Sequence, residues 1–149
     1  RFLFKAIDLY RSRFQPSTQL DKPYVAVAAN AIAADTDAEA HHLLRSLRLR
    51  FAAMARGVRG QLQPPEAFVE ADWSPAELAF ADESLACSAV GSPDEARRQL
   101  EGLIAQTGAD ELVLTAQIFD HAARLKSFAL IGEAWGLPRT VTAGLDAGA

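Results

Sequence analysis

Residues 24–32, which read YVAVAANAI, decide the fold of this chain because they are almost wholly apolar. A short apolar run rich in valine and alanine predicts a strand buried on both faces, as strands in parallel sheets are. Asn30 is the one polar residue after Tyr24 in this run. Thr36 follows, with Glu39 three residues later, and this is the pattern of a capping box at the start of a helix. The stretch therefore predicts a strand that leads directly into a helix.

The same pattern of strand followed by capped helix recurs twice more. A strand is expected over residues 86–90, and the sequence VGSPDE at residues 90–95 predicts a capping box formed by Ser92 and Glu95. Another strand is expected over residues 111–118, before the last helix. Strands that alternate with helices indicate parallel βαβ units of the α/β class. Three strands are too few for a doubly wound sheet, and a closed barrel takes about 250 residues, so the sequence is typical of part of a barrel.

The remaining stretches are consistent with one domain. Residues 2–14 have helical spacing, whereas residues 57–72 lose periodicity and predict a long, mobile connection. The tail over residues 139–149 is expected to be loose. Because the chain opens with RFLFK rather than methionine, we expect residues 1–149 to be one partial domain of a longer protein.

Composition and charge exclude several classes of function. Half of the residues are hydrophobic, which is enough to bury a core. The net charge is −4, so nucleic acid is not expected as a partner. No apolar run approaches the roughly 20 residues that span a bilayer, and we expect a cytoplasmic protein without membrane contact. Cys87 is the only cysteine and is predicted to be a small core residue. Five arginines make one helix locally basic, and we interpret them as a solvated face; they are Arg45, Arg48, Arg50, Arg56 and Arg59.

Several short motifs, taken in order, resemble the bacterial luciferase-like family of flavin-dependent monooxygenases. They are AIDLYR at 6–11, FQPS at 14–17, AADTDAEA at 33–40, VGSPDE at 90–95, TGADEL at 107–112 and FDH at 119–121. Each motif alone is weak, but their order and spacing cover nearly the whole chain. The resemblance implies the C-terminal part of a TIM-type (β/α)8 barrel, with the N-terminal half of the barrel outside these residues.

The resemblance also implies a chemistry and a set of partners. Proteins of this family bind FMN at the C-terminal mouth of the barrel, and a separate flavin reductase delivers it in reduced form. Reduced FMN then reacts with molecular oxygen to oxygenate a small, apolar organic substrate, often an aldehyde. We therefore expect the parent protein to be an oxidoreductase that can form a homo-oligomer, and the isolated chain to lack turnover.

The candidate residues for a cofactor site or pocket follow the second and third predicted strands. They are Gly91, Ser92, Gln117, Phe119, Asp120, His121 and Arg124. Free amides at a helix start attract anions, so Gly91 and Ser92 either contact the cofactor or simply cap a helix. The residues from Gln117 to Arg124 form the richest polar cluster at a strand end, where barrel enzymes build their sites, although Asp120 and His121 could equally serve only as caps. His41 and His42 lack a third ligand at metal spacing, so no metal site is expected.

Two other readings remain open at this point. One is a relative that uses a deazaflavin, or that reduces its substrate rather than oxygenating it. The other is a truncated, non-catalytic module that pairs with another chain through exposed strand edges.

Overall fold

The computed structural model describes residues 2–137, so the expected loose tail at 139–149 lies outside the described residues. Its elements are, in order, α1 (Phe2–Arg13), β1 (Ala26–Ala33), α2 (Asp37–Ala55), the 3-10 turns η1 (Pro65–Ala67) and η2 (Glu70–Asp72), α3 (Pro75–Ser84), β2 (Ala89–Gly91), α4 (Pro93–Thr107), β3 (Glu111–Thr115) and α5 (His121–Ala134). The predicted α/β class, with three strands that alternate with helices, is confirmed.

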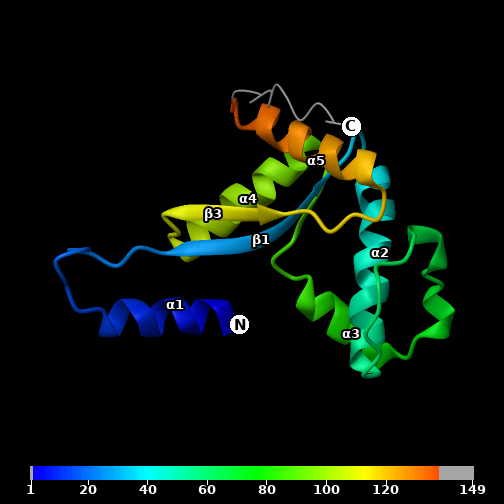
Figure 1. The fold of residues 1–149 in the computed structure, drawn as a ribbon, viewed down its shortest axis with the longest axis horizontal. Coiled ribbons are helices and arrows are strands. Elements are labelled where there is room, and N and C mark those ends of the chain that lie inside the picture. The colour runs from blue at the N-terminus through cyan, green and yellow to red at the C-terminus, as the bar shows by residue number, and fades with distance from the viewer. Residues whose placement is uncertain (1, 138–149) are drawn as a thin grey trace, which may run out of the picture.

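The three strands form one open parallel sheet in the order β2-β1-β3 (Figure 1). Consecutive strands around a barrel would place β2 in the middle, whereas here β1 has that position. β2 has only three residues and pairs with Ala31–Ala33 at the end of β1. The longer β3 pairs with residues 26–30 of the same strand. Within the described residues, the outer edges of β2 and β3 have no strand partner.

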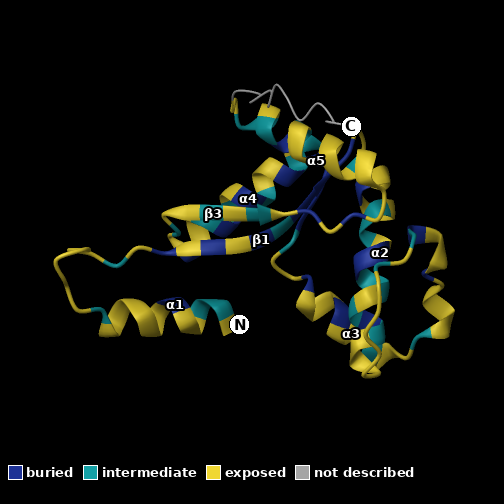
Figure 2. Ribbon diagram, viewed as in Figure 1, coloured by how far each residue is buried: buried dark blue, intermediate teal, exposed yellow. Residues whose placement is uncertain are grey.

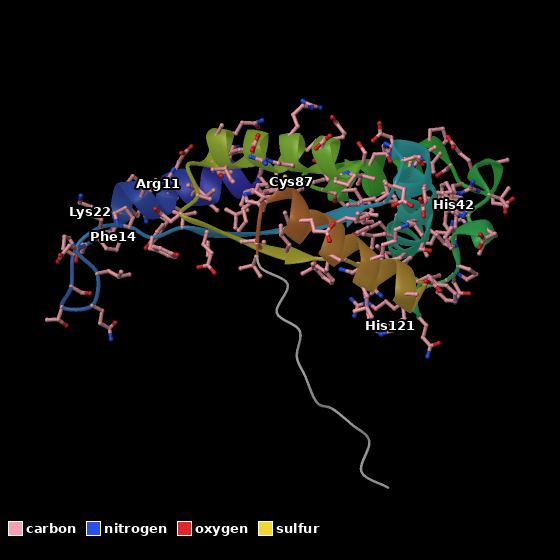
Figure 3. All side chains as sticks on the ribbon, turned by 90° about the horizontal axis from the view of Figure 1, so that it is seen from above. Arg11, Phe14, Lys22, His42, Cys87 and His121 are labelled. Atoms are coloured by element: carbon pink, nitrogen blue, oxygen red, sulfur yellow. The ribbon has the colours of Figure 1, made fainter. Side chains whose placement is uncertain are left out.

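One face of the sheet carries the main core. Val27, Ala29, Ala31 and Ala33 of β1 pack there against α1, α4 and α5, whose buried contributions are Ile7, Ala96, Leu100, Leu103 and Ile131. Arg11 fixes α1 to this layer, since its guanidinium donates to the carbonyls of Thr107 and Gly108 at 2.8 and 2.6 Å (Figure 3). Gly108 ends α4 with a left-handed φ of 57°, as expected of a C-terminal glycine.

The opposite face of the sheet is open along most of its length (Figure 2). Ala26 and Ala28 of β1 are exposed, and so are their register partners Glu111 and Val113 on β3. The prediction that residues 24–32 are buried on both faces is therefore wrong for the first half of β1. Burial on both faces begins at Ala31, where α2 and the residues after β3 cover the sheet.

The helices α2 and α3 lie side by side and form an arm with the 3-10 turns between them (Figure 1). Phe68 is buried in this arm. The guanidinium carbons of Arg45 and Arg48 lie 5.9 and 5.3 Å from the centre of its ring. Arg45 also donates to the carbonyl of Phe68, and Arg48 pairs with Asp82. Arg45 is exposed, as the interpretation of a solvated face expects, whereas Arg48 is half-buried. Through these contacts both arginines hold the second half of the 57–72 connection against α2.

The end of the same connection is held by a third arginine. Arg56 stacks 4.0 Å from the centre of the Trp73 ring and donates to the carbonyl of Asp72. It also pairs with Glu77, the residue that completes the capping box of Ser74 at the start of α3. The Arg56 guanidinium holds the pKa of Glu77 at about 2, well below its usual value.

Candidate functional site

The three parallel strands end at one edge of the sheet, and the predicted site residues lie there. Gly91 and Ser92 follow β2, whereas the residues from Gln117 to Arg124 follow β3. Because β1 lies between β2 and β3, the two groups are on opposite sides of the end of β1. The candidates therefore all follow the carboxyl ends of the strands, but they form two clusters rather than one.

The start of α4 beside Gly91 is occupied by a carboxylate of the protein. The amide of Ser92 donates to Oδ1 of Asp37 at 2.6 Å, and this bond lowers the pKa of the Asp37 carboxyl. A Cβ atom at Gly91 would lie 2.9 Å from the same oxygen and 2.7 Å from Cγ of Glu95. Gly91 is therefore needed for the close approach of Asp37 and Glu95 to this turn.

The predicted capping box of Ser92 and Glu95 is wrong. The Ser92 side chain makes no capping hydrogen bond to α4. The Glu95 carboxylate does not bond to the cap amide and instead accepts hydrogen bonds from Arg98 and from Gln99, each at 2.6 Å, so its pKa is lowered to about 2. The helix start is instead stabilised from a distant part of the chain by Asp37, which is a tertiary contact that local spacing does not reveal.

The cluster that follows β3 is exposed and combines polar and aromatic groups. Asp120 caps α5 by accepting from the amide of Ala123 at 2.7 Å, as predicted. Nη2 of Arg124 lies 2.7 Å from Nδ1 of His121 (Figure 3). A guanidinium can only donate, so Nδ1 is the acceptor in this contact. Before the cap, Gln117 is exposed, as is Phe119, which leaves 51% of its surface open.

Asn30 and Thr115 are functional candidates that the sequence reasoning did not select. The Thr115 hydroxyl donates to Oδ1 of Asn30 at 2.8 Å, across the pairing of β1 with β3. Since the Asn30 oxygen accepts this bond, its amide group faces outward as a donor on the open face of the sheet. The polar residue within an apolar run was visible in the sequence, but its partner 85 residues away was not.

Two contacts made by α5, just after this cluster, fix the helix to the end of β1. The buried hydroxyl of Ser127 on α5 accepts a hydrogen bond from the amide of Ala33 at 2.9 Å. Lys126 pairs with Asp35 at 2.6 Å, which raises the pKa of the lysine. The α5 helix therefore holds its first turn beside the end of the sheet.

The other residues considered in the sequence do not join this edge. Nε2 of His42 lies 3.1 Å from Glu66 in the arm, and Cys87 is exposed, so the prediction of a core cysteine is wrong. Among residues 2–137, no group of three or more metal-ligating side chains is close enough to hold an ion. The helices of this same part of the chain are too short or too polar to cross a membrane.

Comparisons with known proteins agree with the resemblance seen in the motifs. Over 128 residues, 86% of this chain, the sequence is 44% identical to a luciferase-like monooxygenase of Escherichia coli K12. It is 42% identical over 130 residues to the Bacillus subtilis protein YvbT. The crystal structure of apo-MsnO8 superposes on 92% of the chain with a TM-score of 0.76 and 33% identity. No protein-family profile matches the chain.

These similarities concern part of each relative. The chain spans 38% of the Escherichia coli protein, 39% of YvbT and 42% of the MsnO8 chain. The sheet of the described residues is open at both edges, which agrees with a chain that matches only part of its relatives. The relatives have further chain that can complete such a sheet.

Proposed function

Because the chain belongs to the luciferase-like monooxygenase family, we propose that it forms part of the site of a monooxygenase that uses reduced FMN and oxygen on a small, apolar organic substrate. The observation that carries the proposal is the 44% identity to the Escherichia coli luciferase-like monooxygenase, which extends over 86% of the chain. A separate reductase would supply the reduced flavin. The proposal concerns a protein of the relatives' length, and we expect the 149 residues alone to lack turnover.

The residues present fit a flavin unevenly. At the start of α4, the Asp37 carboxylate already accepts from the Ser92 amide, and Glu95 lies beside it, so this turn does not fit a phosphate. The close approach of Asp37 and Glu95 to Gly91 also argues against a phosphate at this turn. We therefore assign Gly91 and Ser92 to the packing of this edge rather than to the phosphate.

The residues that follow β3 fit an organic ligand better. Gln117 and Phe119 are exposed next to the open face of the sheet, and Asn30 offers an amide donor there. Reduced flavin, when bound, supplies the electrons for the reaction with oxygen. The role of this chain's residues would be to orient the ligand: Phe119 by apolar contact, Gln117 and Asn30 by hydrogen bonds.

The proposal is tested by measuring oxygen transfer in a protein of the relatives' length that contains these residues. With reduced FMN, labelled molecular oxygen and a medium-chain aldehyde, we expect one labelled oxygen atom in the product. Product without label, or turnover only with a reduced deazaflavin, would support the alternative chemistry and exclude ours.

Variants measured in the same assay test whether the cluster that follows β3 contacts the ligand. Gln117→Ala and His121→Ala should lower turnover at least tenfold if these side chains contact the ligand. Gln106→Ala and His42→Ala are matched controls, because Gln106 is exposed at the C-terminal end of α4 and His42 is exposed and paired with Glu66 in the arm. Equal losses in test and control variants would show that the effect is not specific to this edge.

A further inference from the structure

A hollow of about 440 Å³ lies between the last turns of α2 and residues 58–63, and no step of the proposed reaction uses it. The 19 residues of α2 begin at the C-terminal edge of the sheet, and a helix of that length extends about 28 Å. The hollow is near its far end. Any ligand bound there would therefore be separate from the cluster that follows β3.

Two arginines line the hollow and have no partner among the described residues. They are Arg50 and Arg59. The other arginines of this region are paired: Arg45 with the Phe68 carbonyl, Arg48 with Asp82 and Arg56 with Glu77. A shortage of acidic groups does not explain the difference, because the chain has 19 acidic and 15 basic residues. Two like charges in one hollow repel, and an anion between them would remove that cost.

The rest of the lining is mainly apolar. Leu49 and Ala53 are half-buried at its base, while Met54 and Val58 are 40% and 56% exposed. Large apolar side chains left open beside two cations are typical of a site for an amphipathic ligand. Methionine adapts its shape to different alkyl groups, which suits a flexible chain.

We propose that this hollow binds a monomeric organic carboxylate with an alkyl chain. Its carboxylate would accept hydrogen bonds from Arg50 and Arg59, because the planar guanidinium matches the two oxygens of a carboxylate. Its hydrocarbon part would lie against Leu49, Met54 and Val58. Gln61, which also lines the hollow, is placed to donate to the same head group. This binding does not depend on the proposed oxygenation and would persist if that proposal failed.

Calorimetric titration of the 149-residue chain with decanoate, below its micellar concentration, tests the proposal. We expect binding near one to one, and 1-decanol should bind at least tenfold more weakly because it lacks the charge. The double variant Arg50→Gln/Arg59→Gln should lose at least tenfold in decanoate affinity. Both residues are exposed and without partners, so the substitutions leave the fold intact, which circular dichroism will verify.

The control is Arg13→Gln, which removes one positive charge from an exposed arginine at the end of α1 that also has no partner among the described residues. It should leave decanoate affinity unchanged. Three outcomes overturn the proposal: no decanoate binding, equal affinity for decanol, or equal affinity in the double variant. Arginine-dependent binding to anionic phospholipid vesicles without binding of free decanoate also overturns it, since the site would then serve a lipid surface.

Discussion

Two buried serines should respond in opposite directions to the same substitution. Ser46 on α2 and Ser127 on α5 are both 0% exposed. The Ser127 hydroxyl accepts from the amide of Ala33, whereas the Ser46 hydroxyl has no hydrogen-bond partner. Ser127→Ala leaves the buried Ala33 amide unpaired, which costs about 1–3 kcal/mol of unfolding free energy. Ser46→Ala removes an unsatisfied group and improves helix propensity, so we expect a gain of about 1 kcal/mol.

Urea denaturation of the chain and of each variant measures these changes in the free energy of unfolding. The two variants should differ by about 2–4 kcal/mol, although each loses only one oxygen atom. Ser12→Ala is the control, because that hydroxyl is exposed and bonds only to the carbonyl three residues before it. Equal shifts for Ser46→Ala and Ser127→Ala, or a larger loss at Ser46, would refute the reasoning from hydrogen-bond satisfaction.

Four other predictions concern the arm, the edge of the sheet and flavin binding. Phe68→Ala removes a ring that is 3% exposed and should cost about 3–5 kcal/mol in chemical denaturation, while opening residues 64–72 to proteases. The pKa of Glu77 falls from 4.5 unfolded to about 2 folded, so its stabilisation is complete above pH 4.5 and is lost as the pH falls toward 2. Acid titration followed by circular dichroism should therefore show a shallower loss of stability over that range in Glu77→Gln. Oxidised FMN should not bind the chain in the low micromolar range by calorimetry, and in a protein of the relatives' length Arg124→Gln should weaken FMN binding more than Ser92→Ala does.

The parts of the fold that depend on local sequence were predictable. The caps at Thr36 and Asp120 lie where their sequence patterns place them, because a cap joins atoms only three residues apart. The end of α4 at Gly108, a glycine in the left-handed conformation, likewise depends on local sequence. The alternation of strands and helices follows from these start and stop positions, and so does the edge of the sheet where the candidate residues lie.

The contacts that the sequence did not reveal join distant residues. Ser92 has a good local capping pattern, yet its amide donates to Asp37, 55 positions away. Asn30 finds Thr115 only when β3 pairs with β1, and that pairing leaves half of the apolar run open on one face. Periodicity reports how apolar a segment is, and it does not report which neighbours cover each face. Burial of β1 and of Cys87 was therefore predicted less well than the boundaries of the elements.

The charges at the C-terminal edge of the sheet indicate where an anionic part of a ligand would bind. Lys126 is paired with Asp35, and Arg98 is paired with Glu95, so both cations are neutralised by the protein. Arg124 differs because its partner is the ring of His121 rather than a carboxylate, so no acidic group compensates its positive charge in that contact. The first turn of α5 adds the partial positive charge of a helix start. A phosphate that reaches this edge therefore meets attraction beside β3, whereas beside β2 it would have to displace the Asp37 carboxylate from the Ser92 amide.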